Sequence, residues 1–204
     1  MVRCPSFIVH RQSNMLPSLE QQVEASRATL QSLLEQREII ESIAVQVRDT
    51  VLRGNTLFAC GNGGSATDAQ HLVEELVARY RSNRRALPAV ALSADSAVLT
   101  CIGNDFGFEQ VFARQLEALA RPSDLLICFT TSGNSPNIIA ALRMARERGA
   151  ATIGLLGKDG GAAREIADTA LVVRSEDTAR IQEAHALIMH YICETVEQAV
   201  VGKT

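Results

Sequence analysis

The sequence contains no tryptophan, and aromatic residues make up only 4% of its 204 residues. Proteins that bind single-stranded nucleic acid usually stack the bases on aromatic side chains, so this class of protein is not favoured. The formal net charge is −3, from 20 basic and 23 acidic residues. Such a balance provides no general attraction to nucleic acid or to an anionic membrane, and we expect neither as a partner. A small anionic ligand would need local hydrogen-bond donors.

A disulfide framework and a hydrophobic segment of membrane-spanning length are also missing. The five cysteines are scattered, no Cys-x-x-Cys pair occurs, and no apolar run approaches the ~20 residues that span a bilayer. We interpret Cys60 and Cys128, which lie in apolar runs, as buried thiols of a reducing cytoplasm. Residues 1–16 have no signal-peptide pattern and are predicted to be a loose extension, with Met1 and Met15 both open as the start of translation.

The sequence does contain a regular alternation of helices and short apolar strands. Apolar residues at helical spacing between 17 and 53 predict one long helix, or two with a break near Gln36-Arg37. Strands are predicted at 56–60, 89–92, 124–129, 152–156 and 170–173. Helices are predicted at 66–81, 108–119, 136–148 and 178–200, with a short one after 161; the segment up to Gly103 is interpreted as a connection of small residues. This order predicts an α/β fold with a doubly wound, mainly parallel five-stranded sheet and an N-terminal helical region.

A loop rich in hydroxyl groups, Thr130-Thr131-Ser132-Gly133-Asn134-Ser135, lies between the strand at 124–129 and a helix that begins at Pro136. The first turn of a helix has unpaired N–H groups and a partial positive charge, which attract anions. We therefore expect this loop to bind a phosphate group. The simpler interpretation is that Ser135 only caps the helix, but a cap explains one hydroxyl and leaves the others unexplained.

A second loop, Gly61-Asn62-Gly63-Gly64-Ser65, follows the strand at 56–60. It fits a loose G-x-G-x-x-A pattern, which is only a weak indication of a dinucleotide site. No lysine of a phosphate-binding P-loop follows, and Asp95 comes late for an acidic residue that would bind a ribose. A tight turn that needs glycine is the simplest explanation. We favour a third use, in which the exposed backbone and Asn62 line the pocket of a polar ligand.

Two predicted helices carry histidine together with other polar side chains. His71 and Glu75 lie four residues apart, on one helix face, while Gln182 and His190 lie eight apart on the last helix. Together they have the ligand types of a divalent metal site, and a histidine with a carboxylate is equally suited to acid–base chemistry. A helix-stabilising contact between His71 and Glu75 is the alternative. His185 is out of register and is assigned to the core or to a supporting position.

Six motifs occur in order between residue 17 and the end of the chain. They are Cys60-Gly61-Asn62-Gly63-Gly64-Ser65, His71 with Glu75, Gly103-Asn104-Asp105-Phe106-Gly107, Thr130-Thr131-Ser132-Gly133-Asn134-Ser135, Gly157-Lys158-Asp159-Gly160-Gly161, and Arg180-Ile181-Gln182-Glu183 with His190. Together they resemble the sugar isomerase (SIS) domain and, within it, the phosphoheptose isomerase family. The resemblance implies one flavodoxin-like SIS domain over residues 17–204, including the N-terminal helices.

The resemblance also implies a function. It implies conversion of sedoheptulose 7-phosphate to D-glycero-D-manno-heptose 7-phosphate through an enediolate, in a homotetramer with one Zn²⁺ per subunit. Glu75 would be the catalytic base and His190 its acid partner. The implied metal ligands are His71, Glu75, Gln182 and His190. The implied substrate-binding residues are Asn62, Gly63, Gly64, Ser65, Glu75, Asn104, Asp105, Thr130, Thr131, Ser132, Ser135 and Gln182.

The chain departs from the family pattern in a few places. Ala179 precedes the Arg-Ile-Gln-Glu motif where some members have Asp, and we expect Asp177 to substitute for it. This change bears on which sugar phosphate is bound more than on the type of reaction. The alternative function is a non-catalytic SIS protein, either one that associates with the replication initiator DnaA or one that senses sugar phosphates. The presence of both Glu75 and His190 favours the enzyme.

Overall fold

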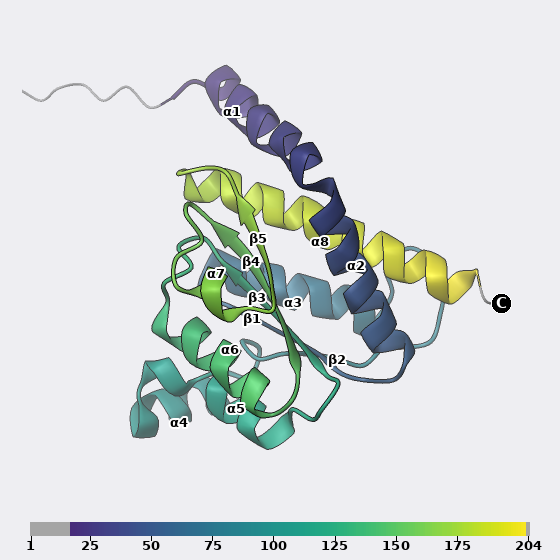
Figure 1. The fold of residues 1–204 in the computed structure, drawn as a ribbon, viewed down its shortest axis with the longest axis vertical. Coiled ribbons are helices and arrows are strands. Elements are labelled where there is room, and N and C mark those ends of the chain that lie inside the picture. Colours follow the sequence, from purple (N-terminus) through teal and green to yellow (C-terminus); the bar gives the residue numbers. More distant parts are fainter. Residues whose placement is uncertain (1–16, 203–204) are drawn as a thin grey trace, which may run out of the picture.

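The structure, a computed structural model, describes residues 17–202, so the predicted extension, with Cys4 and Met15, lies outside the described residues. Its centre is a sheet of five strands, all parallel, in the order β2-β1-β3-β4-β5 (Figure 1). The strands are β1 (Leu57–Gly61), β2 (Ala89–Ala91), β3 (Leu125–Thr130), β4 (Ala151–Gly157) and β5 (Thr169–Val173). The doubly wound parallel sheet predicted from the sequence is confirmed, and the strand order is that of flavodoxin-like folds.

Helices cover both faces of the sheet because side chains of each strand point alternately to opposite sides. On one face α2 (Arg37–Leu52), α3 (Gly64–Val77) and α8 (Thr178–Val201) bury a core with inward residues such as Ile127 and Leu155. On the other face α4 (Ser96–Phe106), α5 (Ala113–Leu119), α6 (Pro136–Glu147) and α7 (Ala163–Ile166) pack on residues such as Phe58 and Leu126. The short 3₁₀ helix η2 (Phe108–Gln110) joins α4 to α5.

Of the two arrangements left open for the N-terminal helical region, the structure has two helices with a break. Helix α1 (Leu19–Ser32) is followed by a 3₁₀ turn, η1 (Leu33–Gln36), before α2 begins at Arg37. Ser18 and Gln21 form a reciprocal capping box at the start of α1. Helix α2 packs along α8, while α1 extends past the body of the molecule (Figure 1).

Three predicted elements need correction. The helix predicted at 108–119 is divided into the 3₁₀ helix η2 and the helix α5, which begins at Ala113. The segment after β2, interpreted as a connection of small residues, forms the helix α4, because Asp95 caps its first turn by accepting hydrogen bonds from the N–H groups of Ala97 and Val98. Helix α3 ends at Val77 and not at Arg81, and the chain beyond it folds back over α3 and α8.

Candidate functional site

A small pocket lies where the strand order reverses, at the carboxyl ends of β1 and β3. It is lined by residues of both predicted loops, namely Asn62, Ser65, Phe129, Thr130, Thr131, Ser132 and Ser135. Ligands of open α/β sheets bind at this position because the connections from neighbouring strands leave in opposite directions and open a crevice. The structure thus brings together the hydroxyl-rich loop and the glycine-rich loop, which lie about 70 residues apart in the sequence.

The hydroxyl-rich loop, residues 130–135, is held in shape by hydrogen bonds from its backbone N–H groups to its own side chains. The N–H of Gly133 donates to Oγ1 of Thr130 (3.2 Å), and the N–H of Asn134 donates to Oγ of Ser132 (3.3 Å). Gly133 has a φ of +64°, and a Cβ there would lie 1.9 Å from the carbonyl oxygen of Gly160, so only glycine fits. Ser135 occupies the N-cap position of α6, yet its side chain makes no capping hydrogen bond. Its hydroxyl therefore remains available to a ligand.

The glycine-rich loop brings an amide to the same pocket. Gly63 has a φ of +56°, and α3 begins at Gly64, with Ser65 buried. The amides of Asn62 and Asn137 form two reciprocal hydrogen bonds of 2.9 and 2.8 Å. Each NH₂ group uses one of its two donors in this pair, which leaves Asn62 one N–H for a ligand. Asn137 is buried in the first turn of α6 and was not predicted; a polar residue directly after Pro136 was the only indication in the sequence.

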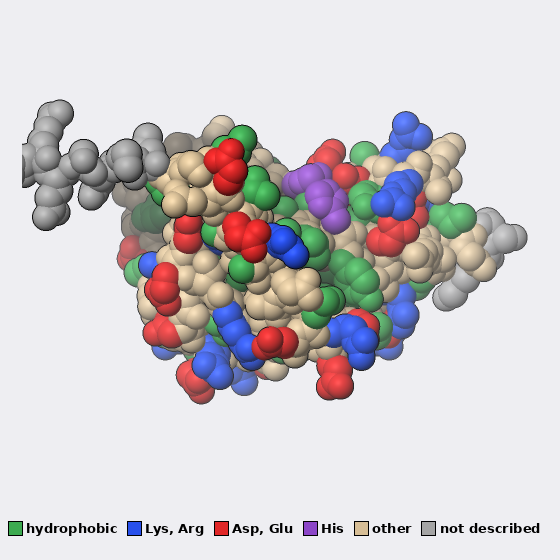
Figure 2. All heavy atoms as spheres, turned by 90° about the horizontal axis from the view of Figure 1, so that it is seen from above, with side chains coloured by type: hydrophobic (Ala, Val, Ile, Leu, Met, Phe, Trp, Pro, Cys, Tyr) green, Lys and Arg blue, Asp and Glu red, His purple; other side chains and the backbone are tan. Residues whose placement is uncertain are grey.

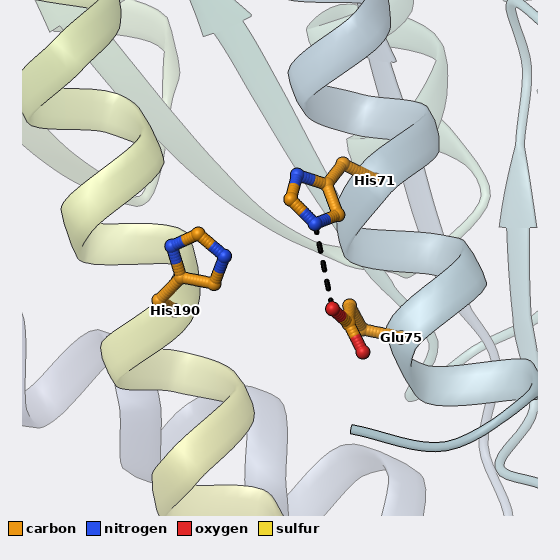
Figure 3. Close-up of side chains that lie close together, drawn as sticks. All are labelled: His71, Glu75 and His190. Atoms are coloured by element: carbon orange, nitrogen blue, oxygen red, sulfur yellow. Dashed lines mark ion pairs between the residues drawn. The ribbon is translucent and has the colours of Figure 1, made fainter. Parts of the chain in front are cut away.

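A second polar group lies between α3 and α8. His71, Glu75 and His190 each offer a ligand atom within 4.8 Å of the other two, and all three residues are half-buried. Nε2 of His71 lies 3.4 Å from Oε1 of Glu75, and the rings of His71 and His190 meet edge to face with centroids 5.1 Å apart (Figure 3). Figure 2 shows histidine side chains in a hollow of the surface, beside acidic and hydrophobic side chains. This His–Glu cluster brings together three of the four predicted metal ligands.

Gln182, the fourth predicted ligand, contacts the beginning of α3. A Cβ atom built on Gly64 would lie 2.3 Å from its Nε2 atom, so the amide lies directly against the backbone of Gly64. Gln182 therefore lies beside the glycine-rich loop, at the beginning of the helix that carries His71 and Glu75 further along. From Ser65 to His71 the helix advances about 9 Å, at ~1.5 Å per residue. The two groups of polar residues are thus a short distance apart along one helix.

Two predicted substrate-binding residues lie elsewhere in the chain. Asn104 and Asp105 are exposed on α4 and are not among the residues that line the pocket. The amide of Asn104 donates to Oδ1 of Asp105 (2.6 Å). Asp177, expected to substitute at the Ala179 position, is the N-cap of α8 and accepts a hydrogen bond from the N–H of Ala179 (2.8 Å).

Two further residues close to the cluster were not predicted. Asp68 lies one turn before His71, and its Oδ2 atom is buried with no hydrogen-bond partner among residues 17–202. Burial raises the pKa of Asp68 to about 6, although His71 opposes the shift. The ring of Tyr80, which follows α3, lies 6.2 Å from the ring of His190. Neither residue belongs to a recognisable motif, so only the folded chain reveals them.

His185 is a core residue, as expected. It is fully buried, contacts the ring of Phe129 and hydrogen-bonds through Nε2 with the carbonyl oxygen of Leu156 (3.2 Å). Burial lowers its pKa to about 4, and the bond to Leu156 opposes this only in part. His185 is therefore neutral at pH 7 and fixes α8 to the end of β4.

The fold and the pocket at the strand-order reversal define an α/β protein of the SIS class. The SIS-domain family model matches residues 21–157. The chain is 49% identical over 187 residues to a phosphoheptose isomerase of Pelobacter propionicus, an alignment that covers 91% of this chain and 99% of that one. The chain therefore belongs to the phosphoheptose isomerase family of SIS-domain proteins.

Solved structures agree with this assignment. A phosphoheptose isomerase from Francisella tularensis superposes with a TM-score of 0.82 at 35% identity, covering 90% of this chain and 100% of that chain. One from Neisseria gonorrhoeae superposes with a TM-score of 0.82 at 38% identity, covering 89% and 100%. Between residues 17 and 202, no helix is both long and apolar enough to cross a membrane.

Proposed function

We propose that this protein is an aldose–ketose isomerase that converts sedoheptulose 7-phosphate to D-glycero-D-manno-heptose 7-phosphate. The observation that carries the proposal is the position of two sites along α3. A pocket of hydroxyl groups lies near its first turn, and an acid–base cluster lies two turns further on. An extended seven-carbon sugar phosphate has a length of the same order as this separation. Its phosphate would lie against residues 130–135 and its carbonyl end against Glu75 and His190.

The phosphate is bound by neutral donors in this proposal. The hydroxyls of Thr130, Thr131, Ser132 and Ser135 surround the pocket, and the N-terminus of α6 adds a favourable dipole. No titratable group lines the pocket among the described residues, so affinity for the phosphate depends on hydrogen bonds and the helix dipole. Asn62, Gly63, Gly64 and Ser65 contact the sugar chain, and Gln182 lies beside them. Asn104 and Asp105 on α4 remain proposed contacts.

The isomerisation moves the carbonyl group from C2 to C1 without a change in composition. Glu75 accepts the proton that leaves C1, a double bond forms between C1 and C2, and the oxygen on C2 takes the negative charge. His190, as the acid, protonates that oxygen. Glu75 then returns its proton to C2, and His190 takes the proton of the C1 hydroxyl, which becomes the aldehyde. The remaining N–H of Asn62 is a donor for the enediolate oxygen. The enzyme ends each cycle in its starting protonation state.

We also propose that the His–Glu cluster holds a zinc ion, with Gln182 as fourth ligand. Two imidazoles and one carboxylate with ligand atoms within 4.8 Å of one another fit the donor set that Zn²⁺ prefers. Bound zinc would polarise the substrate carbonyl and so favour loss of the neighbouring proton. A carboxylate committed to a metal is a weaker base, so Glu75 must either shift between the two roles or work while the metal is peripheral. Metal content measured by mass spectrometry tests the zinc proposal separately.

The function is tested by incubating the purified protein with sedoheptulose 7-phosphate and following aldose formation. We expect turnover by the wild type, with kcat lowered at least 100-fold in both Glu75→Gln and His190→Ala. No turnover by the wild type with this or any other ketose phosphate would overturn the proposal. The non-catalytic SIS alternative is not favoured, because relatives that are 48–49% identical over more than 90% of this chain are named phosphoheptose isomerase.

The assembly and the compartment are part of the same proposal. A groove of about 910 Å³ runs along α1, η1, α2 and α8, and exposed apolar side chains line it, among them Leu19, Val23, Leu34, Leu187 and Tyr191. Such a surface is costly to leave in water, and we propose that it is covered in a homotetramer. We place the protein in a reducing cytoplasm, since Cys60 and Cys128 are fully buried thiols with sulfur atoms 3.4 Å apart.

A further inference from the structure

A buried ion pair links the ends of the two helices that carry the His–Glu cluster. Nε of Arg84 lies 3.4 Å from Oε2 of Glu197, and the two side chains are only 3% and 7% exposed. Arg84 belongs to the segment that follows α3, and Glu197 lies on α8, two turns beyond His190 and therefore on the same helix face. The pair takes no part in the reaction proposed above.

The guanidinium of Arg84 hydrogen-bonds to the backbone carbonyls at the end of α3, including that of Glu75. Its Nη2 atom donates to the carbonyl oxygen of Glu75 (2.6 Å), and Nη1 donates to those of Leu76 (2.8 Å) and Arg85 (2.9 Å). The last four carbonyl groups of a helix have no partner within it, and α3 ends at Val77. Arg84 therefore satisfies two of these carbonyls and places a positive charge at the negative end of the helix dipole. The turn that presents Glu75 is held by a side chain.

Glu197 completes the link from the other helix. Its Oε1 atom accepts hydrogen bonds from the backbone N–H groups of Arg81 (2.8 Å) and Ser82, while Oε2 faces Arg84. Burial by itself would raise the pKa of Glu197, but the bonds from Ser82 and Arg81 and the charge of Arg84 outweigh it and hold the pKa below the ordinary value of a glutamate. Both oxygens of the carboxylate therefore accept hydrogen bonds, one from the backbone of the segment after α3 and the other from Arg84.

We propose that Arg84 and Glu197 are positioning residues that set the distance between Glu75 and His190. This inference rests on the proposed function of those two residues. The guanidinium of Arg84 donates to the backbone carbonyl of Glu75 and also pairs with Glu197, which lies on the same face of α8 as His190. A guanidinium suits this role because its donors lie in a fixed plane and reach several acceptors at once, which the single ammonium of lysine does not do. The pair also holds Tyr80 beside His190, since it anchors the backbone of Arg81 next to Tyr80.

The test compares the conservative variants Arg84→Lys and Glu197→Gln with the wild type. Glu197→Gln keeps the size of the side chain, and Arg84→Lys keeps its charge. Misplacement of a catalytic group by about 1 Å can lower a rate about 100-fold. We expect kcat for sedoheptulose 7-phosphate to fall about 10- to 100-fold in each variant, normalised to folded protein, while KM changes less than about threefold. KM is spared because the residues of the phosphate pocket contact neither member of the pair.

A matched control breaks a different ion pair between the same two segments. Nη1 of Arg81 lies 2.8 Å from Oε2 of Glu194, but the side chain of Arg81 is 66% exposed, and its other contact is with the side chain of Tyr80 and not with a carbonyl of α3. Arg81→Gln should leave kcat within about twofold of the wild type. A purely structural role would lower the melting temperature of Arg84→Lys and Glu197→Gln without changing kcat per folded molecule, and this result would overturn the inference.

A second readout does not depend on turnover. The cluster takes ligands from α3 and α8, so a changed distance between them should weaken its affinity for Zn²⁺ alone, measured by competition with a chromophoric chelator, by at least tenfold in both variants and not in Arg81→Gln. If the wild type turns over its substrate but all variants match it in kcat and zinc affinity, the inference fails and the proposed function stands. If the wild type neither turns over nor binds zinc, the proposed function fails and the inference fails with it.

Discussion

At the scale of single residues, the hydroxyl of Ser135 separates two interpretations of its loop. Ser135 occupies the N-cap position of α6 but makes no side-chain capping bond, and it lines the pocket at the ends of β1 and β3. A residue that only capped the helix would have used its hydroxyl for that purpose. The ligand interpretation is therefore the stronger one for this side chain.

Replacing Ser135 with alanine should weaken substrate binding and leave folding almost unchanged. A hydrogen bond to a charged group contributes about 1.5–3 kcal/mol, so we expect KM to rise roughly 10- to 100-fold. The free energy of unfolding should change by less than about 0.5 kcal/mol, because no cap is lost. Steady-state kinetics measures the change in KM, and urea denaturation measures the change in the free energy of unfolding. A loss of about 1 kcal/mol in stability with an unchanged KM would identify Ser135 as a cap only.

His185 makes stability depend on pH in a defined window. Its folded-state pKa is about 4, against 6.5 for an unperturbed histidine, so the unfolded chain binds the extra proton first as the pH falls. The contribution of neutral His185 is fully present above pH 6.5 and is lost between pH 6.5 and about 4. The total loss is on the order of 3 kcal/mol. Unfolding measured at several pH values should show this slope in the wild type and a flatter one in His185→Gln; equal slopes would contradict the assignment.

At the scale of elements, the sequence predicted the strongly periodic segments and missed what tertiary contacts decide. The five strands and the break before α2 follow from apolar period and loop chemistry. Helix α4 was missed because Gly103, Asn104 and Asp105 are poor helix formers, and its cap and its burial of Ile102 compensate. The pairings of Asn62 with Asn137 and of Arg84 with Glu197 join residues far apart in the chain, so no local pattern reports them.

The contact between β4 and α8 leaves no space for a side chain at Gly157. A Cβ there would lie 2.5 Å from Cδ1 of Ile181 and 2.8 Å from the carbonyl oxygen of Thr131. Gly157→Ala should therefore destabilise the fold by about 1–3 kcal/mol and displace α8 from the sheet. Gly103→Ala is the control, because the nearest atom would be Cγ1 of Val111 at 3.9 Å and the site is helical, so stability should stay equal or rise by up to about 1 kcal/mol. Urea denaturation of both variants measures their free energies of unfolding. If Gly157→Ala is as stable as the wild type, α8 moves away from the sheet at no cost, and the expectation is wrong.

At the scale of the whole molecule, the acid–base cluster lies on one side of the sheet with α2, α3 and α8, and the N-terminal helices extend from that side (Figure 1). The groove along α1 and α8 carries Leu34, which is 65% exposed, and Leu187, which is 45% exposed. If copies of the chain pack through this groove, both side chains become buried in the assembly.

A charge placed in the groove should therefore break the proposed homotetramer. We expect light scattering after gel filtration to give four times the 22.0 kDa chain mass for the wild type and a smaller species for Leu34→Glu. The control is Glu24→Gln, which changes an exposed charge outside the groove residues and should leave the mass unchanged. A monomeric wild type at micromolar concentration would contradict the proposed assembly.

The most direct test of the proposed mechanism is the fate of the transferred proton. Wild-type protein and Glu75→Gln are incubated with sedoheptulose 7-phosphate in D₂O, and the aldose product is analysed by NMR. A carboxylate that carries the proton exchanges it with solvent, so we predict deuterium at C2 of the wild-type product. Glu75→Gln should form product at least 100-fold more slowly. Turnover of Glu75→Gln at the wild-type rate, or a product that carries no deuterium at C2, would contradict the assignment of Glu75 as the base.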